Sequence, residues 1–99
     1  MYLNLWGGWL VHQTKDDLRR IRFVALGLTI ASLRKIQGLS QEELAEKAEI
    51  SRSHLSAIEA PNIVRSFSVE VLFNIADALN IQAGELLDSV STSNVVHRK

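Results

Sequence analysis

Residues 40–59 of this chain read SQEELAEKAEISRSHLSAIE and contain two helix starts in close succession. Ser40 and Glu43 have the spacing of a capping box, in which each side chain accepts a hydrogen bond from the other residue's backbone N–H. Ser51 is a suitable N-cap for a second helix, whose Leu55 and Ile58 are spaced to face inward. The pattern predicts two short helices, at 41–48 and 51–59, joined by a tight turn.

The shortness of this turn favours two helices that cross almost at right angles, because an antiparallel pair needs a longer connection. Small Ala45 permits the close approach, and Ile50 fills the turn. The second helix is then presented to solvent, with four residues on its outer face: Arg52, Ser53, Ser56 and Ala57. An arginine, short hydroxyls and a methyl group suit the edges of bases in the major groove of DNA. The stretch therefore predicts recognition and not catalysis.

Further helices are predicted on both sides of this pair. Thr14 and Asp17 resemble a capping box, and Gly38 stands where a glycine commonly ends a helix. Between them, apolar residues recur at helical spacing: Leu18, Ile21, Val24, Ala25, Leu28, Ala31 and Ile36. Ser68 opens another helix that closes near Asn80, and a last short helix is predicted near 84–89. The expected fold class is all-α, a compact five-helix bundle.

The chain is divided by composition into one domain and two terminal segments. The domain is predicted at residues 14–89, and a flexible tail without helical periodicity is predicted at 90–99. An extra apolar N-terminal arm that contains Trp6 and Trp9 is predicted at residues 1–13. This arm either docks on a hydrophobic patch or on a dimer partner, or is disordered; its aromatic content favours docking.

Composition argues against several classes of protein. The 11 basic and 11 acidic side chains give a formal net charge of zero, which disfavours a polyanion binder that relies on bulk charge. Cysteine is absent and the three histidines lack ligand-like spacing, so no metal, cofactor or small-molecule ligand is expected. Neither Ser53 nor Ser56 has a general base at a useful spacing, which argues against an enzyme. The apolar start lacks a basic region and a cleavage site and is too short to span a membrane, so a cytoplasmic protein without membrane association is predicted.

Residues 26–87 resemble the Xre/Cro family of phage-type repressors. The similarity lies in LRK at 33–35, GLSQEELAEKA at 38–48 and ISRSHLSAIE at 50–59. It implies a lambda-repressor-like fold with the helix-turn-helix motif at 41–59, whose second helix enters the major groove. Members usually bind partly palindromic operators as two-fold dimers. The resemblance thus predicts a sequence-specific double-stranded DNA-binding regulator of transcription, a repressor that acts as a homodimer.

The predicted DNA-binding residues lie at the starts of the two motif helices, along the second one and on the loop that follows: Ser40, Gln41, Ser51, Arg52, Ser53, His54, Ser56, Ala57 and Arg65. By resemblance, the Gln41 amide would donate to a phosphate, and Ser40 and Ser51 would cap their helices and touch phosphate. Arg52 and the neighbouring small residues would read or line the groove. The alternative for His54 is packing at the edge of the helix, and the alternative for Arg65 is a mobile surface residue.

The resemblance also implies a structural ion pair outside the DNA site, between Arg34 and Glu59. Two features depart from the family pattern. Glu49 occupies the interhelical turn where the family usually has glycine, and a left-handed backbone at a non-glycine residue costs about 1–2 kcal/mol. The loop at 60–67 is longer than usual.

Two rival functions remain open on the sequence. One is an antitoxin or another protein-binding adaptor, which zero net charge and the apolar N-terminus favour slightly. The other is the controller protein of a restriction system, which would still bind DNA. Salt dependence separates DNA binding from an apolar protein interface, because only phosphate contacts release counterions.

Overall fold

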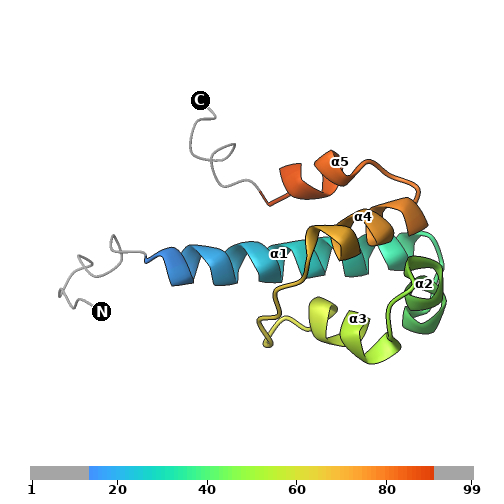
Figure 1. Ribbon diagram of the computed structural model, residues 1–99, viewed down its shortest axis with the longest axis horizontal. Coiled ribbons are helices and arrows are strands. Elements are labelled where there is room, and N and C mark those ends of the chain that lie inside the picture. Colours follow the sequence, from blue (N-terminus) through green and yellow to red (C-terminus); the bar gives the residue numbers. More distant parts are fainter. Residues whose placement is uncertain (1–13, 91–99) are drawn as a thin grey trace.

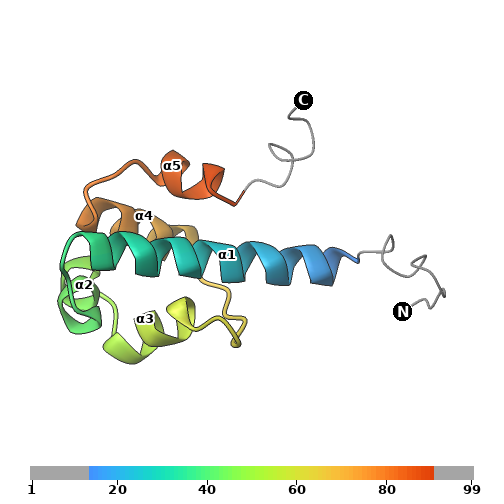
Figure 2. The same cartoon turned by 180° about the vertical axis from the view of Figure 1, so that it is seen from behind.

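The computed structural model describes residues 14–90, and this part of the chain forms five helices. They are α1 (Lys15–Ile36), α2 (Gln41–Ala48), α3 (Arg52–Glu59), α4 (Val69–Ala78) and α5 (Ala83–Asp88). Figure 1 and Figure 2 show α1 as the long central helix, with α3 on one side and α5 on the opposite side. The predicted all-α, five-helix class is confirmed. The predicted arm at 1–13 and residues 91–99 of the predicted tail lie outside the described residues.

Local side-chain chemistry decides where the helices begin. Thr14 Oγ1 accepts the Asp17 N–H at 3.0 Å, and the Asp17 carboxylate accepts the Thr14 N–H at 3.3 Å. Ser40 and Glu43 form the same reciprocal pair at the start of α2, at 3.0 and 2.8 Å. Ser68 caps α4 through its hydroxyl oxygen at 3.1 Å. Each of these caps satisfies an N–H that has no partner within its helix, so each helix begins where the sequence predicted.

All five helices contribute to one hydrophobic core. Each supplies one large side chain without exposed surface: Ile30, Leu44, Leu55, Ile75 and Leu86 are all 0% exposed. Smaller residues, among them Ala45, let α2 approach its neighbours. Since removal of apolar surface from water is the main stabilising term, the orientation of α2 and α3 depends on the whole bundle.

The apolar periodicity that predicted α1 does not mark its buried face. Ile21 and Leu28 are each 46% exposed, and Ile36 is 78% exposed. The buried positions of α1 are instead Leu26, Gly27, Ile30 and Arg34. Apolar residues lie on more than one face of this helix, so the periodicity established a helix without selecting the side that meets the bundle. Among residues 14–90, nothing consequently covers this apolar surface of α1.

Three of the described residues adopt left-handed backbone, each just after a helix. Gly38 follows α1 with φ 76°, Glu49 follows α2 with φ 59°, and Asn80 follows α4 with φ 63°. The left-handed conformation predicted for Glu49 is therefore confirmed, and Asn80 adopts it at the end of the helix that was predicted to close near it. Only glycine adopts this conformation without steric cost, and asparagine tolerates it better than glutamate does.

The Glu49→Gly variant should be more stable than the wild type by roughly 1 kcal/mol, because it removes the clash between Cβ and the backbone in the left-handed region. Urea unfolding followed by circular dichroism measures the change. Asn80→Gly is the matched control, and it should give a smaller gain. Equal or lower stability of Glu49→Gly would show that the left-handed turn carries no such strain.

Candidate nucleic-acid interface

The α2–turn–α3 unit is held from both sides of its turn. The Ile50 N–H donates to the Ala45 carbonyl at 3.0 Å and so closes the end of α2 across the left-handed Glu49. On α3, Leu55 is 0% exposed and Ile58 is 3% exposed, which anchors the helix to the core. The first turn of α3 is thereby directed outward.

The predicted base-reading residues differ in exposure along α3. Arg52 and Ser53 are exposed in the first turn, whereas His54, Ser56 and Ala57 are half-buried. An arginine at the amino end of an exposed helix can reach the O6 and N7 acceptors of guanine. The free part of this surface is therefore concentrated at the start of α3.

The two capping serines and the loop arginine take different places around α3. Ser40 and Ser51 are exposed at the starts of α2 and α3, which contact each other. Arg65 is also exposed, but it lies on the loop that follows the carboxyl end of α3. The structure thus places Ser51 at the turn of the motif, Ser40 at the opposite end of α2, and Arg65 beyond the carboxyl end of α3.

The capping serines retain a donor for an incoming anion. Ser51 Oγ accepts the His54 N–H at 3.0 Å and lies 3.5 Å from Ser53 Oγ, where either hydroxyl can donate. Ser40 Oγ accepts the Glu43 N–H at 3.0 Å. A hydroxyl that accepts a hydrogen bond still has its own proton to donate. Both caps are therefore compatible with a phosphate contact.

The carboxylate of Glu43 modifies the potential at the start of α2. The Ser40 backbone N–H, and then the Ser40 side chain, hold the pKa of Glu43 below its usual range. The group is therefore ionised at neutral pH, and its negative charge opposes the positive potential of the helix N-terminus. Anion binding at the start of α2 therefore depends more on hydroxyl and amide donors than on the net charge of this region.

The ion pair implied by the family resemblance is present and buried. Arg34 Nε donates to Glu59 Oε2 at 2.8 Å, and its second terminal nitrogen donates to Oε1 at 2.9 Å. The two side chains are 10% and 4% exposed. The remaining terminal nitrogen donates to the Leu39 carbonyl at 2.8 Å. The hydrogen bond to Glu59 raises the pKa of Arg34, so the guanidinium stays charged and joins α1 to the end of α3.

Gln41 belongs to the same network. Its Nε2 donates to Glu59 Oε1 at 2.9 Å, and the side chain is half-buried. One N–H of the amide is therefore used to hold α2 against the end of α3. The second amide N–H remains for an external acceptor.

Gly27 is a positioning residue that the sequence analysis did not identify. A Cβ atom built on it would lie 1.9 Å from the backbone oxygen of Ile58, so the backbones of α1 and α3 are in direct contact there. The available signal was a glycine inside a predicted helix, where glycine is intrinsically unfavourable. The signal did not reveal which segment approaches it.

Within residues 14–90, no cluster of three histidine, aspartate or glutamate side chains is arranged to hold a metal ion. None of the described helices is both long and apolar enough to cross a membrane.

The HTH_3 helix-turn-helix model matches residues 30–86, which is more than half of the chain and includes both motif helices. The chain belongs to the HTH_3 family. This result confirms the Xre/Cro-type resemblance of the sequence. HTH_3 proteins are helix-turn-helix transcription regulators and not enzymes, as the sequence also predicted.

This HTH_3 chain is 38% identical over 63 residues to the HTH-type transcriptional regulator SinR of Bacillus subtilis (strain 168), covering 64% of this chain and 56% of SinR. It thus spans about half the length of the curated relatives it matches. Its fold is similar to SinR in a crystal structure with DNA, with a TM-score of 0.59, 38% identity and coverage of 64% of this chain and 98% of that chain. It is also similar to the restriction-modification controller protein C.AhdI from Aeromonas hydrophila, with a TM-score of 0.61 and 34% identity. The similarity covers 65% of this chain and 94% of C.AhdI.

Proposed function

We propose that this chain binds double-stranded DNA in a sequence-specific manner and regulates transcription. The observation that carries the proposal is the exposed first turn of α3, where Arg52 and Ser53 face solvent while Leu55 and Ile58 anchor the helix. HTH_3 membership supports it, and so does the similarity to SinR, which has been crystallised with DNA.

In the proposed complex, phosphate contacts set the register and α3 reads the bases. The hydroxyls of Ser40 and Ser51 and the free amide N–H of Gln41 donate to backbone phosphates. Arg52 reads guanine in the major groove, and Ser53 makes a second polar contact beside it. The half-buried His54, Ser56 and Ala57 line the groove, and Arg65 contacts the backbone beyond the end of α3.

The finer proposal is a homodimeric repressor on a partly palindromic operator. One small domain makes few contacts, and two linked half-sites raise the effective concentration of the second domain without new contacts. The two recognition helices then lie about one DNA turn apart, roughly 34–36 Å. A dimer bound at a promoter blocks access to it, and we expect this activity in the cytoplasm.

Selection of binding sites from random duplexes tests this function. The wild type should enrich a two-fold symmetric motif. Arg52→Ala should lose discrimination at one position of each half-site, by about 1–3 kcal/mol, which corresponds to roughly five- to 150-fold in affinity. Titration of the selected duplex, followed by fluorescence anisotropy, measures the loss.

Arg19→Ala is the matched control, because it removes the same charge from the amino-terminal half of α1, where the Arg19 side chain is 55% exposed. It should leave the selected motif unchanged. Enrichment of no motif by the wild type at low salt, or equal losses for both variants, would contradict the assignment of α3.

The alternative, a protein-binding adaptor, is favoured by the zero net charge and the uncovered apolar surface of α1. Salt titration of the complex distinguishes the two functions. The logarithm of the DNA association constant should fall linearly with the logarithm of the salt concentration, with a slope of about −0.9 for each phosphate neutralised. An apolar protein interface should respond little to salt.

A further inference from the structure

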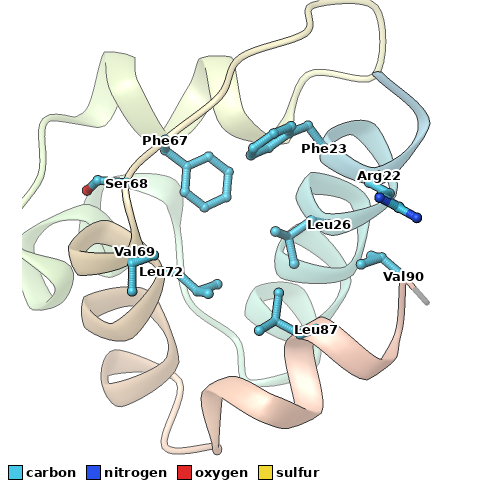
Figure 3. A pocket seen from close by; sticks show the side chains of 9 residues that line it. All are labelled: Arg22, Phe23, Leu26, Phe67, Ser68, Val69, Leu72, Leu87 and Val90. Carbon is cyan, nitrogen blue, oxygen red and sulfur yellow. The ribbon is translucent and has the colours of Figure 1, made fainter. Parts of the chain in front are cut away.

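An apolar groove lies between α1, α4 and α5, with a volume of about 270 Å³. Its floor is formed by Leu26 and Leu72, which are 5% and 7% exposed. Its rim includes Val69, 63% exposed, and Leu87, 48% exposed. Figure 3 shows these side chains converging from the three helices on a shared hollow. Large apolar side chains in one concave patch indicate a surface that binds an apolar partner.

Aromatic rings give this groove a chemical preference. Phe23 of α1 and Phe67, just before α4, meet edge to face with ring centroids 5.4 Å apart, and both line the groove. Arg22 lies at its border (Figure 3). Aromatic rings and a guanidinium group both make favourable contacts with an indole ring.

A second groove lies along another part of α1, between Ile21, Leu28 and Pro61. Its walls also contain Arg20 and Asn62, and none of its lining residues is aromatic. The groove that contains Phe23 and Phe67 is therefore the better match for tryptophan.

The sequence contains an apolar segment directly before α1. Residues 1–13 carry no acidic or basic side chain apart from a histidine, and they include both tryptophans of the chain, Trp6 and Trp9. The function proposed above uses none of these residues.

The length of this segment is sufficient to reach the groove. Trp9 precedes Thr14 by five residues, which span up to about 17 Å when extended. Phe23 follows Thr14 by nine residues, or about 14 Å along the helix axis. Trp6, eight residues before Thr14, spans up to about 27 Å, and Leu26 lies about 18 Å along α1.

We propose that residues 1–13 fold back along α1 and place the indole rings of Trp6 and Trp9 in the α1–α4–α5 groove of the same chain. Covalent attachment favours this occupant over a second copy, because the local concentration of the segment does not fall on dilution. The segment would cover the uncovered rim at Val69 and Leu87. Since α5 and α3 lie on opposite sides of α1 (Figure 1), the docked segment leaves α3 accessible.

Intrinsic fluorescence of the full chain tests the proposal directly, because both tryptophans lie in the segment. Wild-type emission should be blue-shifted and protected from acrylamide. Val69→Lys and Leu87→Lys place a charge on the exposed rim, and each should shift the emission to the red and raise the quenching constant severalfold. Circular dichroism should show an unchanged helix content.

Two matched variants carry the same new charge away from this groove. Ile21→Lys alters the second groove at a side chain that is 46% exposed, and Phe73→Lys alters a side chain of α4 that is 52% exposed. Neither should change the emission. Solvent-like emission of the wild type, or a red shift with Ile21→Lys but not with Val69→Lys, would overturn the proposal. A red shift of the wild type on dilution, in step with dissociation measured by ultracentrifugation, would assign the groove to a second copy instead.

Discussion

The Gly27→Ala variant is expected to lose about 3 kcal/mol of folding free energy or more, which lies at or above the upper end of overpacking effects. The added Cβ would lie 1.9 Å from the Ile58 backbone oxygen and 3.0 Å from its carbonyl carbon. A backbone carbonyl cannot rotate away as a side chain can, so α1 and α3 would have to separate. Separation would expose Leu55 and Ile58, which anchor α3. Urea unfolding followed by circular dichroism measures the loss.

Helix propensity alone predicts that Gly27→Ala stabilises the fold, since alanine is favoured over glycine inside a helix by about 1 kcal/mol. Gly84→Ala in α5 is the matched control, because a Cβ there meets no atom within 4 Å. This control should be neutral or slightly stabilising. If Gly27→Ala were as stable as Gly84→Ala, the close contact between α1 and α3 would be refuted.

Removal of Arg34 should also destabilise the fold strongly. In Arg34→Met, the Glu59 carboxylate, with a side chain only 4% exposed, keeps Gln41 as a donor but loses its cationic partner. Breaking one side of a buried ion pair typically costs about 3–5 kcal/mol. Thermal and urea unfolding should report this loss, and DNA binding should fall with the population of folded protein.

The double variant Arg34→Met with Glu59→Leu should recover most of the loss, because apolar residues can replace a buried pair at little cost. Lys35→Met is the control at the exposed neighbour, with an expected effect within about 0.5 kcal/mol. An Arg34→Met protein as stable as Lys35→Met would rule out a structural role for the pair.

The raised pKa of Arg34 should not make stability sensitive to pH near neutrality. The hydrogen bond to Glu59 raises the pKa of Arg34 above its ordinary range. For a base whose pKa is higher in the folded state, the stabilisation is complete at any pH below the pKa of the unfolded state. It is lost only as the pH rises through the higher pKa of the folded state. That window lies far above neutral pH.

Short-range features were predictable from the sequence because they depend on residues three or four positions apart. The caps at Thr14, Ser40, Ser51 and Ser68 are local hydrogen bonds, and each helix they open begins as predicted. The fifth helix begins at Ala83, after Gln82, slightly earlier than expected. Glutamine is not among the preferred N-cap residues, so this start had a weaker signal.

The exposed residues of the candidate site were predictable from the sequence, and the hydrogen bonds between its distant residues were not. Leu55 and Ile58 mark the buried face of α3, and this indicates an exposed Arg52 from spacing alone. The hydrogen bond from Gln41 to Glu59 joins residues 18 positions apart, and no local pattern predicts it. The number of amide N–H groups that Gln41 leaves free is therefore a tertiary property.

The sequence by itself determined the helices, their caps, the left-handed turn at Glu49 and the outward face of α3, because backbone geometry and side-chain spacing over a few residues decide each of them. Tertiary structure alone decided which face of α1 is buried, and that Gly27 allows the backbone of Ile58 to approach. It also decided that Gln41 joins the Arg34–Glu59 ion pair, which the family resemblance had implied without Gln41. These features depend on segments that meet only when the bundle closes, and the position of α3 depends on them.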